Sequence, residues 1–390
     1  MNFVTTRKEA LDVMERYIEN NISDYTAKRN FDFGPQNRKN ISCLSPYITH
    51  RLISEYEVAK KTLSKYPYQK VEKFIQEIFW RVYWKGWLEL RPKVWTDFVE
   101  DTKNIENTNE YEKAINSETN IDCFNDWVKE LKENNYLHNH TRMWFASIWI
   151  FTLKLPWQKG AEFFLRELYD GDAASNTLSW RWVAGIQTKG KNYIAQNWNI
   201  NKFTNNKYKD LKLNENPQPI IDQRDYKISP LSVCNNEAAS DRLVFFENEL
   251  DFQFFNTNNY KKIYCILLAN DERQIKLGSK VLDYKKNLIK NQIQNSGLKI
   301  EFIEGNKGNY FDIDENVNPD IQGTLTDMSL VDSSSVDAIF SSHNIEHIFA
   351  HEVPIALKEF NRVLKDDGIV VITCPDLQRV CDAVAKNKLL

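Results

Sequence analysis

The sequence predicts a multidomain protein, with an all-α domain over residues 1–200 followed by an α/β, Rossmann-like C-terminal region. Up to about Trp198, apolar residues recur every three or four positions, which is typical of amphipathic helices. From about Leu243, short apolar runs of strand length alternate with helical stretches, which indicates strand–helix–strand units and a parallel sheet. A chain of 390 residues is long enough for two or three such domains.

Several stretches of the first part have the helical spacing: Thr6–Ile18, Pro46–Leu63, Val71–Leu90, Asp122–Lys132, Thr141–Leu153 and Trp157–Leu168. The Ser45-Pro46 pair is a good helix start, with serine as N-cap and proline in the first turn. Residues 201–242 are rich in Asn, Pro, Lys and Asp, so we expect an irregular linker there.

The C-terminal region is expected to hold a small α/β segment over residues 243–298 and a partial α/β domain over residues 299–390. Apolar runs predict strands at Tyr264–Leu268, Lys299–Ile303, Val336–Ser341 and Gly368–Cys374. Amphipathic spacing predicts helices at Gln274–Asn295 and His351–Leu364.

The composition leaves the class of binding partner open, because a net charge of −3 neither supports nor excludes binding to nucleic acid. The cysteines form no C-x-x-C pair and fit no zinc or iron–sulfur spacing, so we expect no metal site. His343, His347 and His351 recur every four residues, but polar residues lining a cleft explain them better than a metal. No signal peptide is visible and the apolar stretch Trp144–Leu155 is too short for a bilayer, so we expect no membrane association and a cytoplasmic protein.

The run from Asp170 to Trp182 carries the most chemical information. Two carboxylates, Asp170 and Asp172, flank a glycine, Asn176 follows, and Trp180 and Trp182 flank an arginine. All eleven tryptophans of the chain lie between Trp80 and Trp198. This concentration of polar and aromatic groups predicts a site where a large, planar, redox-active ligand meets a tryptophan.

Three further segments accompany this run, in order. They are Ser42-Cys43-Leu44-Ser45-Pro46-Tyr47 with Tyr25 upstream, Phe74-Ile75-Gln76-Glu77-Ile78-Phe79-Trp80-Arg81, and Leu137-His138-Asn139-His140-Thr141-Arg142-Met143. Together the four segments resemble the motifs of the helical flavin-binding domain of the cryptochrome/photolyase family. The resemblance covers about the first 200 residues.

The resemblance implies FAD as the cofactor. The residues that it assigns to FAD are Tyr25, Ser42, Leu44, Ser45, Phe74, Glu77, Arg81, Asn139, Arg142, Asp170, Asp172 and Asn176. Arg142 and Asp170 would form a rigid ion pair against the flavin ring, with Asp172 on its polar edge and Asn176 near its reactive nitrogen. From the residues alone, a structural ion pair and a helix-capping Asn explain the same pattern.

The resemblance also implies damaged DNA as the partner. Trp80, Trp182 and Met143 would pack around a flipped-out pyrimidine dimer, Arg81 would contact a phosphate or the lesion, and Glu77 would hydrogen-bond the dimer. The residues implied in catalysis are Glu77, Asn176, Trp157 and Trp180, the last two as the inner part of an electron relay. The family's third, surface tryptophan has no clear match, and Trp95 or Trp127 could take its place.

Only a short lead precedes Tyr25, where the family has an α/β antenna domain, so we expect no antenna chromophore domain. Residues from about Lys299 onward resemble part of a class I S-adenosylmethionine-dependent methyltransferase, which implies Asp314 and Asp327 as ligands of that cofactor. Two departures weigh against this activity. The expected Gly-x-Gly-x-Gly loop is reduced to Gly305 and Gly308, and the chain stops at Leu390, before the last strands of such a domain.

The function expected from these patterns is that of a flavin-dependent DNA photolyase, a lyase that repairs pyrimidine dimers by blue-light-driven electron transfer. The alternatives are a cryptochrome-like photoreceptor without repair activity, in which the C-terminal half is the output domain, and an S-adenosylmethionine-dependent methyltransferase. The sequence leaves open the type of lesion and the oligomeric state.

Overall fold

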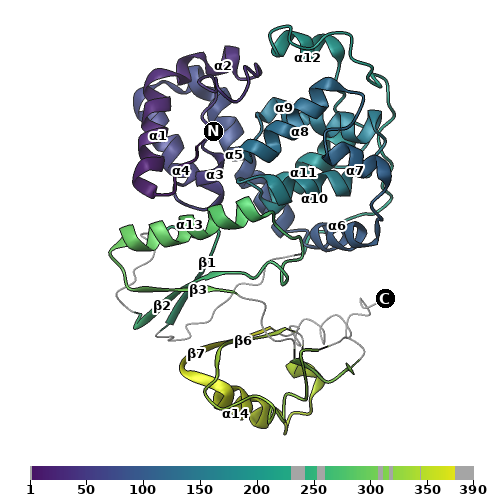
Figure 1. The fold of residues 1–390 in the computed structure, drawn as a ribbon. Helices are drawn as coiled ribbons and strands as arrows, with labels where there is room; N and C mark the ends of the chain where they lie inside the picture. Colours follow the sequence, from purple (N-terminus) through teal and green to yellow (C-terminus); the bar gives the residue numbers. More distant parts are fainter. Residues whose placement is uncertain are drawn as a thin grey trace. The chain divides into compact units, whose positions relative to one another are not determined.

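The computed structural model describes residues 2–229, 242–252, 260–305, 311–315, 319–342 and 344–373. Contacts divide the chain into two compact units, Met1–Asn306 and Lys307–Leu390. The first unit holds the helical part and a three-stranded sheet, and the second holds the later strands (Figure 1). The predicted domain boundaries stay predictions.

The first unit is built mainly from helices, which confirms the helical N-terminal region. Its longer helices are α1 (Arg7–Asn20), α4 (Glu55–Lys65), α5 (Tyr68–Glu89), α6 (Lys93–Asn104), α8 (Asp122–Asn134), α9 (Asn139–Ser147), α10 (Trp157–Glu167), α11 (Ala173–Ala184) and α13 (Ser279–Ser296). Its shorter ones are α2 (Tyr25–Lys28), α3 (Ser45–Thr49), α7 (Asn109–Ile115) and α12 (Asn197–Phe203), and the π-helical turn η2 (Ile148–Thr152) continues α9.

The single helix predicted over Pro46–Leu63 is wrong, because the structure has two helices there, α3 and α4. Ser54 and Glu57 form a capping box, in which each side chain satisfies the other's free backbone N–H, so a new helix starts at Glu55. The prediction that Ser45 is an N-cap is also wrong. Ser45 is the first residue of α3, and its hydroxyl donates to Asp170 instead.

The predicted linker over residues 201–242 begins inside α12, and residues 230–241 lie outside the described part. Residues 205–229 contain no helix or strand. Their backbone is held on the helical part by hydrogen bonds from Ile220 N to Ala184 O (2.9 Å) and from Ser229 N to Leu90 O (2.8 Å). This segment is therefore an ordered strap on the helices.

Three parallel strands follow in the order β1-β2-β3, namely β1 (Arg242–Phe246), β2 (Lys262–Leu267) and β3 (Ile300–Glu304). Helix α13 connects β2 to β3 and lies between the sheet and the helices of the first unit (Figure 1). Strand residues such as Phe245 and Ile263 share one hydrophobic core with Phe3, Tyr47 and Tyr284. The sheet therefore belongs to the same packed body as the helices.

A buried polar cluster lies where α13 meets the helices. Lys285 Nζ lies 3.1 Å from His50 Nε2 and 3.3 Å from Glu247 Oε1, and Arg273 pairs with the same carboxylate. His50 Nδ1 lies 2.7 Å from Pro46 O. Burial, with the nearby Lys285 charge, lowers the pKa of His50 to about 3. The imidazole is therefore neutral, donating from Nδ1 and accepting the lysine proton at Nε2.

The second unit contains two pairs of parallel strands. They are β4 (Phe311–Asp312) with β5 (Ile321–Gln322), and β6 (Val336–Ser342) with β7 (Leu364–Thr373). Helix α14 (Val353–Val363) precedes β7 and buries Phe360 and Val363 against Met328. Parallel sheets in the C-terminal region agree with the prediction; Cys374 of the last predicted strand lies outside the described residues. No helix in the described ranges is long and apolar enough to cross a membrane.

Candidate functional site

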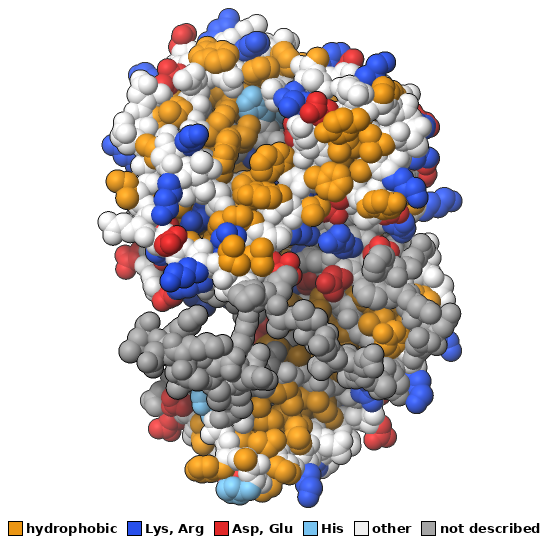
Figure 2. Space-filling view, turned by 180° about the vertical axis from the view of Figure 1, so that it is seen from behind, with side chains coloured by type: hydrophobic (Ala, Val, Ile, Leu, Met, Phe, Trp, Pro, Cys, Tyr) orange, Lys and Arg blue, Asp and Glu red, His pale blue; other side chains and the backbone are white. Residues whose placement is uncertain are grey.

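A large cavity of about 750 Å³ opens in the helical part of the first unit. Its walls come from α5, α9 and α11 together with α2 and the segment that leads into α3. On one face of the helical part, Figure 2 shows hydrophobic side chains gathered with Lys and Arg side chains between them. The volume lies within the range of cofactor sites, roughly 300–1,000 Å³.

Asp170 is the polar centre of this cavity. Its Oδ2 accepts from Arg142 Nη2 at 3.0 Å and from the Ser45 hydroxyl, and its side chain is only 1% exposed. Arg142 Nε also donates to Leu137 O at 3.0 Å, which fixes the guanidinium. Asp170 Oδ1 is buried and has no hydrogen-bond partner among the described residues. A buried carboxylate oxygen without a partner is costly, so the site has an acceptor available for a ligand.

Asp172 and Asn176 lie at the start of α11 and have different surroundings. Asp172 is the N-cap, accepts from Ser175 N at 2.7 Å, lies 3.5 Å from Lys85 Nζ, and is not among the residues that line the cavity. Although burial raises the pKa of Asp172, Arg81, Lys85 and Ser175 outweigh it, so the pKa falls below its usual value. Asn176 lines the cavity and is anchored by Nδ2, which donates to Ala161 O at 2.9 Å.

Glu77 in α5 is held on the cavity wall by two donors. Arg29 Nε lies 2.9 Å from its Oε1, and the Tyr25 hydroxyl donates to its Oε2. Burial and the Glu77 charge raise the pKa of Tyr25, so the phenol stays a donor. The Phe74 ring packs edge-on against Tyr25 at 5.1 Å between centroids. The carboxylate of Glu77 is thus fixed as an acceptor group at the cavity.

Arg81 lies one turn further along α5. Its Nη2 donates to Thr49 Oγ1, while its Nε is buried without a partner in the described parts of the chain. Ser42 and Leu44 line the cavity beside the start of α3, and Asn139 lines it at the start of α9. The charged lining residues are Arg29, Glu77, Arg81, Arg142 and Asp170, three cations against two acids. The lining therefore favours an anionic ligand.

One face of α5 presents a stripe of aromatic side chains to the cavity. Trp80 and Tyr83 are 51% and 52% exposed, and the Trp80 and Trp84 rings lie 5.5 Å apart at 31°. Trp87 continues the stripe. Of these four residues, the sequence motifs assign only Trp80 to the substrate, although the spacing i, i+3, i+4, i+7 from Trp80 indicates the other three.

Two more residues that the sequence assigned to the substrate line the same cavity, Met143 in α9 and Trp182 in α11. The Trp182 ring is stacked on Tyr193, with centroids 5.6 Å apart at 28°. Packing against Tyr193 therefore holds the Trp182 ring in place.

Trp180 lines the cavity and is 2% exposed. Its ring packs against Gly160 of α10, three residues after Trp157. Trp157 does not line the cavity; it is stacked on Phe98 at 5.5 Å, and Phe98 contacts Trp95 at 5.4 Å. An aromatic path thus continues from Trp157 to the partly exposed Trp95.

The second candidate for a surface tryptophan lies elsewhere in the core. Trp127 is 3% exposed and stacked on Trp144, with centroids 5.7 Å apart at 21°. Of the two tryptophans named as substitutes, only Trp95 is joined to Trp157 by a single intervening ring.

In the C-terminal region, the predicted cofactor ligands are exposed. Asp314 follows β4 and Asp327 follows β5, whose parallel pairing brings their carboxyl ends to the same edge. Neither residue lines the 750 Å³ cavity. Close packing explains the glycine at position 305, since a Cβ atom there would lie 2.6 Å from Ala269 N. Gly308 and His343 lie outside the described residues.

The cavity brings together most residues that the sequence assigned to the cofactor and the substrate. They are Tyr25, Ser42, Leu44, Ser45, Phe74, Glu77, Trp80, Arg81, Asn139, Arg142, Met143, Asp170, Asn176, Trp180 and Trp182. Asp172 and Trp157 are not among the lining residues.

Two family models match the chain. The FAD-binding domain of DNA photolyase matches residues 74–215, and a methyltransferase domain matches residues 280–372. The deoxyribodipyrimidine photo-lyase of Agrobacterium fabrum is 30% identical over 183 residues, which are 45% of this chain and 37% of that protein. That of Buchnera aphidicola subsp. Acyrthosiphon pisum is 28% identical over 210 residues, 49% of this chain and 41% of that protein. The chain therefore spans about two fifths of the length of these relatives.

The chain also matches solved structures, among them a bacterial class III photolyase from Agrobacterium tumefaciens. It is 27% identical, with a TM-score of 0.44, and the match covers 51% of this chain and 42% of that one. A cryptochrome from Synechocystis is 20% identical, with a TM-score of 0.47, and covers 52% of this chain and 44% of that one.

Proposed function

We propose that the helical part of this chain belongs to the cryptochrome/photolyase family and that the chain is a light-driven DNA repair lyase. It would hold FAD in the large cavity and split pyrimidine dimers in DNA. The observation that carries the proposal is that one cavity joins the polar cluster around Asp170 to the exposed aromatic stripe on α5. The first part suits a cofactor and the second suits an unstacked base.

The residues of the cavity fit FAD on grounds of their own chemistry. Asp170 Oδ1 is a buried acceptor without a partner among the described residues, and ring N–H groups of a flavin are donors of the matching kind. Arg81 Nε is a buried donor without such a partner, and the excess of cations in the lining suits a pyrophosphate. Ser42 and Ser45 add hydroxyl groups at the start of α3.

The chemistry that this cofactor supplies when bound is light-driven one-electron transfer. Arg142 and Asp170 would orient it, because their ion pair is fixed by Leu137 O and Ser45. Asn176 would present its amide to the same ligand, since Nδ2 is anchored on Ala161 O.

We propose that Trp180 and Trp157 pass electrons toward the cavity from the protein surface, with Trp95 as the outer end of the path. Trp180 is buried at the cavity, and Trp157 reaches Trp95 through Phe98. A Trp180→Phe variant is expected to lose light-driven reduction of bound FAD while it keeps repair activity once FAD is reduced chemically. Equal photoreduction in the variant and the unmodified protein would contradict this path.

Trp80, Trp182 and Met143 would form the pocket for the flipped-out dimer. Flat aromatic faces stack on bases, and Trp80 is half exposed at the cavity, so a base can reach it. Glu77 would accept a hydrogen bond from the dimer, because Arg29 and Tyr25 hold its carboxylate in place.

The test compares two aromatic residues of α5 that are similarly exposed. Trp80→Ala is expected to weaken binding of a dimer-containing oligonucleotide about 5- to 150-fold, from the roughly 1–3 kcal/mol that one stacked base contributes. Phe79→Ala is the matched control, since Phe79 is 43% exposed but does not line the cavity. Equal affinities in the two variants would exclude the lesion pocket.

Repair itself is read from the loss of dimers under blue light. The chain loaded with reduced FAD is expected to restore undamaged thymines in the light and not in the dark. A light-induced structural change without any loss of dimers would instead identify a photoreceptor and refute the repair proposal.

We propose separately that the C-terminal region, which matches a methyltransferase domain over residues 280–372, binds S-adenosylmethionine. The domain match and the parallel pair β6–β7 with α14 support this proposal. The candidate contacts are Asp314 and Asp327. Calorimetric titration of the full chain with S-adenosylmethionine is expected to give a binding signal that Asp314→Asn weakens; no binding by the unmodified chain would refute the proposal.

A further inference from the structure

A second, smaller cavity of about 240 Å³ opens beside the first. Trp87 and Gln187 line both cavities, so the two spaces adjoin. The second space is smaller than ordinary ligand pockets of roughly 300–1,000 Å³. It is therefore suited to one group of a ligand that also occupies the first cavity.

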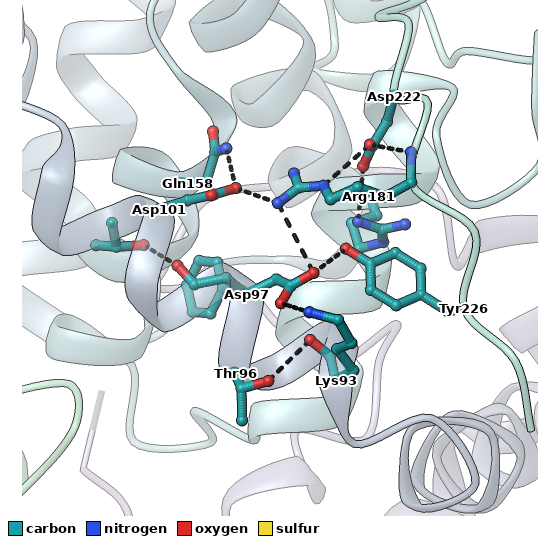
Figure 3. Close-up of polar contacts among 11 residues, drawn as sticks. Lys93, Thr96, Asp97, Asp101, Gln158, Arg181, Asp222 and Tyr226 are labelled. Carbon is teal, nitrogen blue, oxygen red and sulfur yellow. Dashed lines mark hydrogen bonds and ion pairs between the residues drawn. The ribbon is translucent and has the colours of Figure 1, made fainter. Parts of the chain in front are cut away.

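The strap of residues 205–229 builds one wall of this second cavity. Arg224, Asp225 and Tyr226 contribute to its lining, and all three lie beyond residues 74–215, which match the FAD-binding domain. The Tyr226 hydroxyl donates to Asp97 Oδ2 at 3.0 Å, which fixes the strap to α6 (Figure 3). The other six lining residues lie within residues 74–215, so the strap completes a cavity that the matched domain begins.

The lining of the second cavity is strongly basic. It contains Arg91, Arg181, Lys189 and Arg224, against Asp225 as its acidic residue. Neither Arg91 nor Lys189 has a carboxylate within ion-pair distance in the described parts of the chain. Their charges are therefore available to a ligand.

The other two arginines contact acidic residues, of which Figure 3 labels Asp101 and Asp222. Arg224 Nη1 lies 2.9 Å from Asp101 Oδ2, and its Nε lies 3.0 Å from Asp222 Oδ1. Within the described ranges, the polar contacts of the Arg181 side chain are longer: 3.5 Å to Asp222 Oδ2, and 3.4 Å from its Nε to Gln187 Oε1. Asp222 is thus shared by two arginines.

Arg181 is only 4% exposed, so its charge is compensated weakly for a buried group. Burial lowers the pKa of Arg181 in spite of Tyr226 and Asp222. An anion in the cavity would supply the missing counter-charge.

Aromatic rings hold two of the guanidinium groups in position. Arg91 lies 4.4 Å from the centroid of the Trp87 ring, and Arg181 lies 5.3 Å from that of Tyr226. Guanidinium groups stacked in this way present their N–H edges sideways, in the planar geometry that binds phosphate oxygens. The wall is therefore preorganised for a phosphate group.

We propose that the second cavity binds a backbone phosphate of a nucleic-acid strand whose base occupies the first cavity. The inference rests on the proposed function for the identity of the strand. Because Trp87 and Gln187 belong to both linings, a base at the α5 stripe and a neighbouring phosphate can be held together. Arg91 and Lys189 would contact the phosphate, and Arg181 would supply buried positive charge.

The test measures the salt dependence of binding in the dark, with an undamaged fluorescent single-stranded oligonucleotide. Removing one phosphate contact is expected to reduce the slope of log affinity against log salt concentration by about 0.7. The Arg91→Gln/Lys189→Gln double variant should show this reduction. The control Lys113→Gln changes an exposed lysine of α7 that lines neither cavity and should leave the slope unchanged.

Two arms identify the source of the phosphate. The same proteins are titrated with the oligonucleotide and with inorganic phosphate, and thermal unfolding verifies that the double variant is folded. Equal slopes in the double variant and the control would contradict the proposal. So would an unmodified chain that binds no oligonucleotide, or a double variant that loses affinity for inorganic phosphate but not for the oligonucleotide. Failure of the proposed repair function is seen separately, as intact dimers after illumination in a protein that still shows the change in slope.

Discussion

The contact between Gly160 and Trp180 makes a sharp prediction about packing at the cavity. A Cβ atom on Gly160 would lie 2.3 Å from Trp180 Cη2, 2.4 Å from Trp180 Cζ3 and 3.0 Å from Trp149 Cε2. Gly160→Ala therefore requires the Trp180 ring to move within a buried core. Overpacking of this kind costs about 1–3 kcal/mol.

Gly86→Ala is the matched control, because Gly86 also lies inside a helix but has nothing within 4 Å of its Cβ position. Alanine in place of a helical glycine stabilises by about 0.5–1 kcal/mol. That gain is common to both variants and cancels in their difference. The two variants should therefore differ in free energy of unfolding by about 1–3 kcal/mol, with Gly86→Ala the more stable.

Urea unfolding of the full chain, followed by tryptophan fluorescence, measures both variants. The Gly160→Ala variant should also show altered near-ultraviolet circular dichroism, since a buried indole has shifted. If Gly160→Ala stabilised the protein as much as Gly86→Ala, the Trp180 ring would not occupy the space above Gly160, and its assigned place at the cavity would be wrong.

Two other predictions concern the stability of the first unit. The pKa of His50 is about 3 in the folded state, below its usual 6.5, so the unfolded state takes up the proton first as the pH falls. The free energy of unfolding therefore has its full value above pH 6.5. Toward pH 3 it falls by up to about 1.4 kcal/mol per pH unit. His50→Gln should flatten this part of the stability–pH curve in chemical unfolding, and an unchanged slope would mean that another group titrates. Ser54→Ala removes the capping box of α4 and should lower the free energy of unfolding by about 1 kcal/mol, measured in urea. The control Ser64→Ala, at an exposed position near the end of the same helix, should lower it less. Equal losses in the two variants would contradict the assigned cap.

The sequence located much of the polar centre because its residues belong to motifs with distinctive chemistry. Arg142 and Asp170 were expected to pair, and their atoms lie 3.0 Å apart. The role expected for Asp172 differs from its place in the structure, where the side chain caps α11. Capping and ligand binding need the same acidic residue at the same kind of position, so the sequence pattern does not distinguish them.

Other features depend on contacts between distant residues. Tyr226 reaches Asp97 across 129 positions, in a segment without periodicity, so the second cavity had no local signal. The break between α3 and α4 was missed for a different reason. The Ser54–Glu57 capping box is a recognisable local pattern, but the apolar spacing around it continued and favoured one helix.

The affinity of the chain for FAD tests the proposal that the cavity around Asp170 is the FAD site. Asp170→Asn removes the charged partner of Arg142 and is expected to weaken FAD binding about 10- to 150-fold, from roughly 1.5–3 kcal/mol for a hydrogen bond to a charged group. Asp12→Asn, at an exposed position of α1, is the control and should bind like the unmodified protein. We expect one FAD to bind per chain, with the loss of affinity confined to Asp170→Asn. If the unmodified chain bound no FAD, or if both variants had equal affinity, the cavity around Asp170 would not be the FAD site.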